Sequence, residues 1–306
     1  MGRVVGDGSH TAVVALEPGT SLVDLLALDP DVREATVARL AGATLALSEV
    51  ELVAPVYPVA MRDFFTFEKH VEGTAKAVQG MASVPEEWYA APGFLFMAPH
   101  AVHGPYADVA MPPDTERLDY ELELAVVVCR DGRNLTEAQA AECIGGYLVM
   151  NDWSARDVMS REMRMGLGPC KGKDFATTLG PWVVTADELE CHRRDGLMDL
   201  AMTVSRNGTE VGRDRSSSMS WSFEQMLSYA SRASWIKAGE VIGSGTCVGG
   251  AMAEGWGRTG ILDPAPLAVG DRVEMSIEGI GTIANTVVAD PAPVPPVPRA
   301  RRRGPS

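Results

Sequence analysis

The most informative segment of the chain is Leu118-Asp119-Tyr120-Glu121-Leu122-Glu123-Leu124-Ala125-Val126-Val127-Val128. From Leu122 to Val128 it is apolar except for Glu123, which predicts a strand buried on both faces. Side chains alternate along a strand, so Glu121 and Glu123 project together, about 7 Å apart. Two buried carboxylates repel each other and lose hydration, so one is protonated unless a cation lies between them. The alternative is a strand whose acidic face is solvated.

Beyond this stretch the sequence consists mostly of short strands separated by Gly and Pro, with few helices. The other predicted strands are Tyr147–Met150, Trp182–Val184, Leu200–Val204, Val241–Ile242 and Val273–Glu278. Helices are predicted over Thr136–Cys143, capped by Asn134 or Thr136, and over Ser222–Ser231. The sequence lacks βαβ alternation, a GxGxxG after a strand, a P-loop and a GxSxG motif. These features predict a β-rich, mixed α/β fold.

The chain divides into three predicted parts. We predict a small α+β module over residues 1–55, the catalytic domain over residues 56–289, and a disordered Pro/Arg-rich tail over residues 290–306. Within the module we expect two strands, Thr11–Leu16 and Glu49–Val53, and two helices, one beginning at Leu22 after a Ser21 cap and one near Asp31–Leu40. The tail holds the one basic cluster, which consists of Arg299, Arg301, Arg302 and Arg303.

Composition excludes several classes of protein. The 306 residues are 46% hydrophobic and 22% charged, with a net charge of −14, which disfavours nucleic acid and anionic membranes as partners. No stretch reaches the roughly 18 uncharged apolar residues of a membrane span, and the first residues break too soon for a signal-peptide core. The five cysteines include no CxxC pair, which argues against a disulfide framework and a thiolate zinc site. The expected location is the cytoplasm.

Three other segments carry residues that could do chemistry. Asp152 follows the apolar run Gly146–Met150, where polar groups commonly reach a site, although Asp152 or Ser154 could instead cap a helix beginning at Ala155. Asp63 and His70 are seven residues apart and would share one face of a helix, although a lone histidine is more often structural. Lys173 would be a solvated amine unless it points toward the acids, whose charge would keep it protonated.

Taken together, the sequence resembles the fumarylacetoacetate hydrolase family over about residues 50 to 288. Five blocks match in the right order: Asp63–Phe65 with His70, Asp119–Leu124, Met150–Asp157, Gly172–Thr178 followed by Pro181–Trp182, and Gly243–Thr246. The resemblance implies the family's mixed β-sandwich roll, assembled as a homodimer.

The resemblance also implies a role for each matching residue. Asp63, Glu121, Glu123 and Asp152 would hold a divalent cation, Mg²⁺ or else Ca²⁺ or Mn²⁺, with Lys173 and Thr177 beside it. His70, oriented by Glu254, would be the general base that activates water. Phe65, which stands where the family's hydrolase has Tyr, and Thr246 would contact the substrate. Lys173 and Arg156 would help to protonate the carbanion that leaves when a carbon–carbon bond breaks.

This sequence departs from the family pattern at Met159, where the hydrolases usually have a Gln that donates a hydrogen bond. Met159 would either line a pocket for a more apolar substrate or simply pack against the scaffold. We therefore expect a metal-dependent hydrolase that cleaves a C–C bond in an acylpyruvate or β-diketone-like small molecule. The alternatives are a decarboxylase or isomerase of an oxaloacetate-like or hydroxydienoate substrate, and a metal- or ligand-binding relative without turnover.

Overall fold

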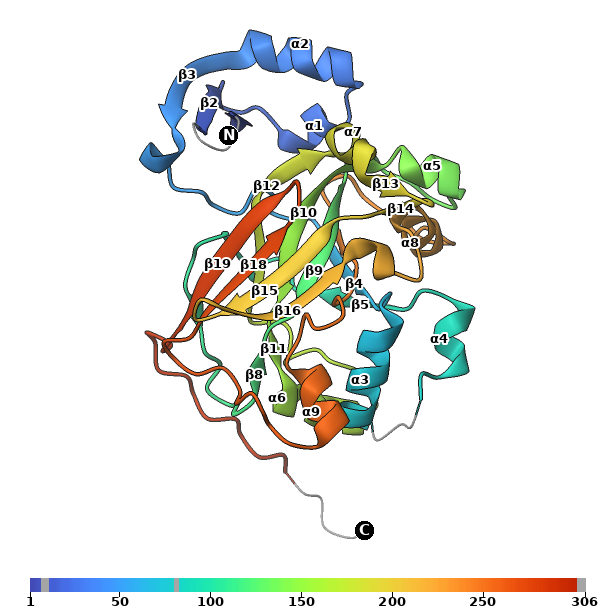
Figure 1. Ribbon diagram of the computed structural model, residues 1–306, viewed down its shortest axis with the longest axis vertical. Helices are drawn as coiled ribbons and strands as arrows, with labels where there is room; N and C mark the ends of the chain where they lie inside the picture. The colour runs from blue at the N-terminus through green and yellow to red at the C-terminus, as the bar shows by residue number, and fades with distance from the viewer. Residues whose placement is uncertain (7–10, 80–82, 302–306) are drawn as a thin grey trace.

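The structure, a computed structural model, describes residues 1–6, 11–79 and 83–301. The stretch Leu118–Val128 runs through the middle of the molecule (Figure 1). Its apolar part forms β9 (Leu122–Val128), in which every residue is buried. One face of β9 enters the main hydrophobic core through Leu122, Leu124, Val126 and Val128. Ala125 and Val127, on the opposite face, belong to a second core. The strand is therefore covered on both sides, as the apolar run predicts.

Two curled sheets enclose the main core (Figure 1). The larger sheet has seven strands in the order β5 (Phe94–Met97), β4 (Met61–Phe64), β17 (Val241–Gly243), β9, β10 (Ile144–Asp152), β12 (Thr177–Thr185) and β6 (Val102–His103). The smaller has five, in the order β16 (Thr209–Arg215), β15 (Ala201–Arg206), β18 (Arg272–Ile277), β19 (Gly281–Val288) and β7 (Val109–Ala110). Two short pairs lie outside these two sheets: β8 (Leu118–Asp119) with β11 (Ser154–Ala155), and β13 (Arg193–Arg194) with β14 (Leu197–Met198). The predicted β-rich mixed fold is confirmed.

Helices lie at both ends of this roll (Figure 1). Near the end that carries β8 and β11 are α3 (Glu68–Gln79), α6 (Arg156–Arg164) and α9 (Ala253–Thr259). Beyond the N-terminal segment, the other helices are α4 (Glu86–Ala90), α5 (Glu137–Ala141), α7 (Ala186–Leu189) and α8 (Phe223–Ala230), and 3₁₀ turns lie at Leu47–Glu49, Glu190–His192 and Ser216–Ser218. Thr136, rather than Asn134, caps α5, because its hydroxyl accepts the Gln139 N–H at 3.3 Å.

The N-terminal segment forms a three-stranded sheet in the order β1 (Gly2–Val5), β2 (Ala12–Leu16) and β3 (Ala41–Ala46), with α1 (Leu22–Leu26) and α2 (Pro30–Leu40) between β2 and β3. Ser21 caps α1 as predicted. The strand predicted over Glu49–Val53 is wrong, because Ala41–Ala46 has already paired with β2. Without a neighbouring strand, Glu49–Val53 has no ladder to join, and the division of the chain at residue 55 stays a prediction.

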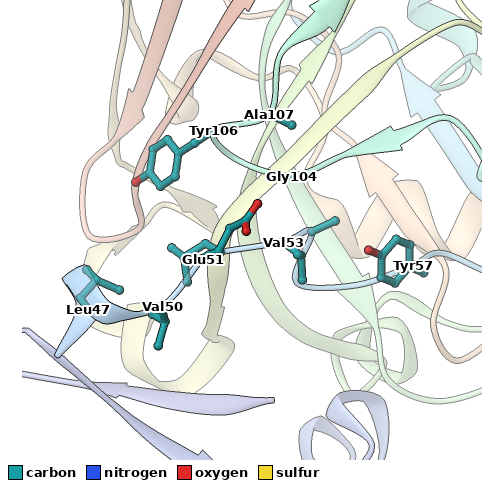
Figure 2. A pocket seen from close by; sticks show the side chains of 10 residues that line it. Leu47, Val50, Glu51, Val53, Tyr57, Gly104, Tyr106 and Ala107 are labelled. Carbon is teal, nitrogen blue, oxygen red and sulfur yellow. The ribbon is translucent and has the colours of Figure 1, made fainter. Parts of the chain in front are cut away.

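After β3 the chain crosses the surface of the main body beside the turn Gly104–Ala107 (Figure 2). A pocket of about 470 Å³ lies at this crossing, lined by Leu47, Val50–Ala54, Tyr57, Gly104, Tyr106 and Ala107. A Cβ on Gly104 would come within 3.2 Å of the Val53 Cα, so glycine allows the close crossing. None of the residues that the sequence analysis assigned to the site lines this pocket.

The last described residues, 290–301, are exposed and form no helix or strand. Arg302 and Arg303 of the predicted basic cluster lie outside the described residues, so disorder of the tail stays a prediction. Among the helices of residues 1–6, 11–79 and 83–301, none combines the length and the apolar character needed to cross a membrane.

Candidate metal centre

Four acidic side chains from neighbouring strands converge in the interior. Asp63 comes from β4, Glu121 directly precedes β9, Glu123 lies in β9, and Asp152 ends β10. One carboxylate oxygen of each lies within 4.8 Å of the other three. All four residues are buried, so the alternative of a solvated strand face is wrong. Asp152 makes no helix cap either, because α6 begins after Ala155 without a side-chain cap.

Two glycines make room for this acid cluster, defined as Asp63, Glu121, Glu123 and Asp152. A Cβ on Gly243 would stand 2.6 Å from Glu123 Oε2 and 2.9 Å from Asp63 Oδ1, so a larger residue would collide with both carboxylates. The Gly245 N–H donates to the same two oxygens, at 3.0 and 3.2 Å. The match at Gly243–Thr246 thus reflects close packing of backbone against the acids.

Two cations contact the acid cluster. The Lys173 ammonium forms ion pairs with Glu121 and Asp152, and the lysine is 3% exposed, which excludes the solvated-amine alternative. Arg156 Nη2 lies 2.7 Å from Glu121 Oε1. Burial alone would raise the pKa of Glu121, but Arg156, Lys173 and His70 together hold it below its usual range. Asp152 and Glu121 likewise hold the Lys173 ammonium charged, against the effect of its burial.

The other three acids have too little positive charge around them. Burial raises the pKa of Asp63 to about 6. Burial, reinforced by the negative charge of Asp63, raises the pKa of Glu123, and burial also raises that of Asp152. Two buried carboxylate oxygens, Glu123 Oε1 and Asp152 Oδ1, have no hydrogen-bond partner among the described residues. Clustered, unpartnered carboxylate oxygens are the donor set of a hard divalent cation, so these residues fit the metal that the sequence predicts.

His70 and Glu254 form a buried pair. His70 Nδ1 lies 2.8 Å from Glu254 Oε1, and both carboxylate oxygens of Glu254 accept the Gly249 N–H at 3.0 Å. The pair joins α3 to α9, and a Cβ on Gly73 of α3 would come within 3.2 Å of the Glu254 Cβ. The interpretation that Asp63 and His70 share a helix is wrong: Asp63 belongs to β4, and α3 starts only at Glu68.

The remaining predicted residues lie around this centre. Thr177 is buried on β12, where it is the pairing partner of Asp152 on the neighbouring strand β10. Thr246 is buried one residue after Gly245. Phe65 is half-buried, with its backbone beside Gly245. Met159 is buried on α6, and a Cβ on Gly172 would come within 2.4 Å of its Cγ, so Met159 packs against the backbone that precedes Lys173. This placement favours the packing alternative for Met159.

Two acids that the sequence analysis gave no role also contact the site's framework. Asp119 accepts hydrogen bonds from Arg156, and Glu162 accepts three consecutive backbone N–H groups, those of Cys170, Lys171 and Gly172. Glu162 thereby holds the turn that delivers Lys173. The place of Asp119 in the quoted block was the only available signal for it, and nothing in the sequence distinguishes Glu162 from a surface acid.

Comparisons with known proteins agree with this geometry. The family model described as "Fumarylacetoacetate (FAA) hydrolase C-terminal" matches residues 61–288. The human mitochondrial oxaloacetate tautomerase FAHD2A is 30% identical over 287 residues, which cover 88% of this chain and 85% of the relative. Oxaloacetate tautomerase YisK of Bacillus subtilis is 28% identical over 243 residues, covering 79% and 74%.

A solved structure has the same fold. The fumarylacetoacetate hydrolase from psychrophilic Exiguobacterium antarcticum superposes with a TM-score of 0.66 at 25% identity, covering 94% of this chain and 99% of that one. The likeness confirms the expected roll. By its sequence match and its fold, the chain belongs to the fumarylacetoacetate hydrolase family.

Proposed function

We propose that this protein is a divalent-metal-dependent tautomerase that interconverts the keto and enol forms of an oxaloacetate-like 2-oxo acid. The observation that carries the proposal is the buried His70–Glu254 pair in the same interior as the acid cluster, Lys173 and Arg156. The oxaloacetate tautomerases that cover most of this chain support this choice over the hydrolase that the sequence analysis favoured. A keto–enol tautomerase is an isomerase, so this proposal is the isomerase alternative that the sequence left open.

Tautomerisation moves one proton: C3 of the keto form loses it, and the oxygen on C2 gains one. Glu254, as a carboxylate, only accepts, so His70 Nδ1 carries the hydrogen of their contact, and in the neutral imidazole Nε2 is the nitrogen that can accept a proton. We infer that Nε2 takes the proton from one position of the substrate and returns it at the other. Glu254 stabilises the imidazolium that exists between the two transfers.

The charged residues prepare the site for a doubly negative substrate. A divalent cation held by Asp63, Glu121, Glu123 and Asp152 would act as a Lewis acid toward the 2-oxo acid group. Lys173 and Arg156, both buried, offset part of the negative charge of the acid cluster, which lowers the repulsion that a dicarboxylate would meet. Thr246 and Phe65 remain our candidates for substrate contacts.

Incubation with oxaloacetate and Mg²⁺ in D₂O tests this proposal. A tautomerase accelerates both the loss of enol absorbance and the exchange of C3 hydrogen for deuterium, and it leaves the carbon skeleton intact. Release of CO₂ would instead identify a decarboxylase. His70→Gln is the matched control, because it keeps a polar side chain in place while removing the base, and it should retain the metal content of the wild type.

Hydrolysis of an acylpyruvate is the second candidate, because the same His70–Glu254 pair could activate water. A hydrolase would incorporate ¹⁸O from labelled water into the carboxylate product, whereas a tautomerase would release no cleavage product. Acylpyruvates assayed beside oxaloacetate under the same conditions therefore separate the two. Homodimer formation is a further proposal, which sedimentation of the purified protein would test.

A further inference from the structure

Asp119 lies where three segments of the site meet. It ends β8, which pairs with β11 immediately before α6, and it faces the first residues of α9. Arg156 is the first residue of α6, and Glu254 is the second residue of α9. The Asp119 side chain is fully buried. One carboxylate therefore touches the segments that carry both Arg156 and Glu254.

All the contacts of this carboxylate are with donors. Asp119 Oδ1 accepts the backbone N–H groups of Tyr120 at 2.9 Å and Met252 at 3.0 Å. Oδ2 accepts the Ala253 N–H at 3.0 Å and two guanidinium bonds, from Arg156 Nε at 2.9 Å and Nη2 at 2.8 Å. Nη2 also reaches Glu121 of the acid cluster. Both oxygens are thus fully used: each accepts a backbone N–H at the start of α9, and Oδ2 also binds Arg156.

We propose that Asp119 is a positioning residue that fixes Glu254 and Arg156 relative to each other, and through them the His70 base relative to the acid cluster. The proposal rests on the proposed function for its kinetic readout. Asp119 itself is not one of the four acids whose oxygens converge, and its own two oxygens accept protein donors. Asp119 binds the backbone of Met252 and Ala253, directly before Glu254, which contacts His70. It also binds the Arg156 guanidinium, which contacts Glu121.

Asp119→Asn tests the arrangement, because it preserves size but replaces one acceptor oxygen with a donor. Whichever way the amide turns, its NH₂ group faces N–H donors. In the place of Oδ1 it loses the Met252 contact, and in the place of Oδ2 it loses the Ala253 contact together with both Arg156 contacts. We expect kcat to fall by about 10- to 100-fold, as for other outer-shell partners, with a much smaller change in KM. Asp271→Asn is the matched control, because Asp271, directly before β18 of the five-stranded sheet, also pairs with an arginine, Arg206, and accepts a backbone N–H.

Double-variant cycles separate positioning from general stability. If Asp119 acts through Glu254 and Arg156, the double variants Asp119→Asn with Glu254→Gln and Asp119→Asn with Arg156→Lys should lose less kcat than two independent effects would predict. The kcat of each double variant should exceed the value predicted from the product of the two single-variant losses by about threefold to 100-fold. Asp271→Asn combined with Glu254→Gln should be additive. Additive kcat effects in both Asp119 cycles would overturn the proposal.

A second readout needs no substrate. The hydrogen-bonded Nδ1 proton of His70 should give an NMR signal that disappears in Glu254→Gln. In Asp119→Asn this signal should shift, or the proton should exchange faster with solvent. In Asp271→Asn the signal should be the same as in wild type. If oxaloacetate is not turned over, the proposed function fails, but this signal still decides the role of Asp119. An unmoved signal in folded Asp119→Asn would overturn that role. If Asp119→Asn does not fold, Asp119→Glu replaces it: its longer side chain displaces the same contacts, and a wild-type signal and kcat would overturn the proposal.

Discussion

Arg62 and Asp63 are neighbours in β4, both are buried, and their surroundings are opposite in kind. Arg62 forms an ion pair with Glu240, donates to the Trp235 carbonyl at 3.0 Å, and lies over the rings of Phe94 and Phe96 at 5.4 and 5.3 Å. Asp63, on the other side of the strand, faces three more acids. The Arg62 side thus contains a matching counter-charge, whereas the four acids on the Asp63 side outnumber the cations that contact them, Lys173 and Arg156.

The difference separates a structural charge from a functional one. Burying a charge is costly unless an opposite charge and hydrogen bonds compensate for it, and Arg62 has both. The acid cluster has four carboxylates against Lys173 and Arg156, and Arg156 is shared with Asp119. Excess buried charge of one sign indicates a ligand of the other sign.

The largest effect should come from removing the metal. A chelator in excess should abolish turnover, and added Mg²⁺ should restore it. Glu123→Gln should weaken Mg²⁺ binding, measured by titration calorimetry, by on the order of tenfold or more. The same variant should melt at a higher temperature than wild type when both are metal-free, because it removes one member of a repelling cluster. Full turnover in chelator, with no metal in the purified protein, would contradict this prediction.

His70→Ala should have the next largest effect. Loss of a general base costs about 10²- to 10⁴-fold in rate, so kcat should fall by that factor while the metal content stays close to wild type. Steady-state kinetics with metal analysis of the same preparation measures both quantities. If only the melting temperature falls, His70 is a structural histidine.

Breaking the Arg62–Glu240 pair should affect stability and not chemistry. Glu240→Gln leaves a buried, unpaired guanidinium, which should lower the free energy of unfolding by about 3–5 kcal/mol in denaturant titrations. The kcat of the folded fraction should stay near wild type. Replacing both residues, as in Arg62→Met with Glu240→Leu, should recover much of the stability, because no uncompensated charge then remains. A large fall in kcat would mean that the two sides of β4 are coupled.

The stability of the metal-free protein should depend on pH through the acid cluster. Burial raises the pKa of Asp63 from 3.8 to about 6, so the folded protein holds this proton more tightly than the unfolded chain does. Stability should therefore fall as pH rises from about 4 to about 6. Mg²⁺ affinity should change in the opposite direction, weakening below pH 6 as protons compete for the ligands. Melting curves and calorimetry across this range measure both, and Glu123→Gln should flatten them.

Met159→Gln should have the smallest effect. Met159 packs against Gly172, and substitutions of similar volume in packed interiors usually cost under about 1.5 kcal/mol beyond the cost of the added polar group. Activity toward oxaloacetate and toward acylpyruvates should then change in parallel or not at all. Opposite changes in kcat/KM for the two substrates would mean that residue 159 sets specificity.

Elements whose signal is local could be predicted from the sequence. The apolar run of β9 shows burial on both faces because no polar side chain interrupts it apart from Glu123. Ser21 and Thr136 mark helix starts because capping depends only on residues within one turn. The four acids of the cluster could be named in advance because they lie within blocks that resemble a family.

Tertiary structure alone decided which elements pair and which donors each acid meets. Ala41–Ala46 forms a strand and Glu49–Val53 does not, because a strand depends on a neighbouring ladder that sequence periodicity does not reveal. Asp119 and Glu162 were missed for the same reason, since their partners lie far along the chain or in the backbone of a turn. Hydrogen bonds and ion pairs act over a few ångströms in space, whatever the separation in sequence. The chemical character of this site was therefore visible in the sequence, and its arrangement only in the fold.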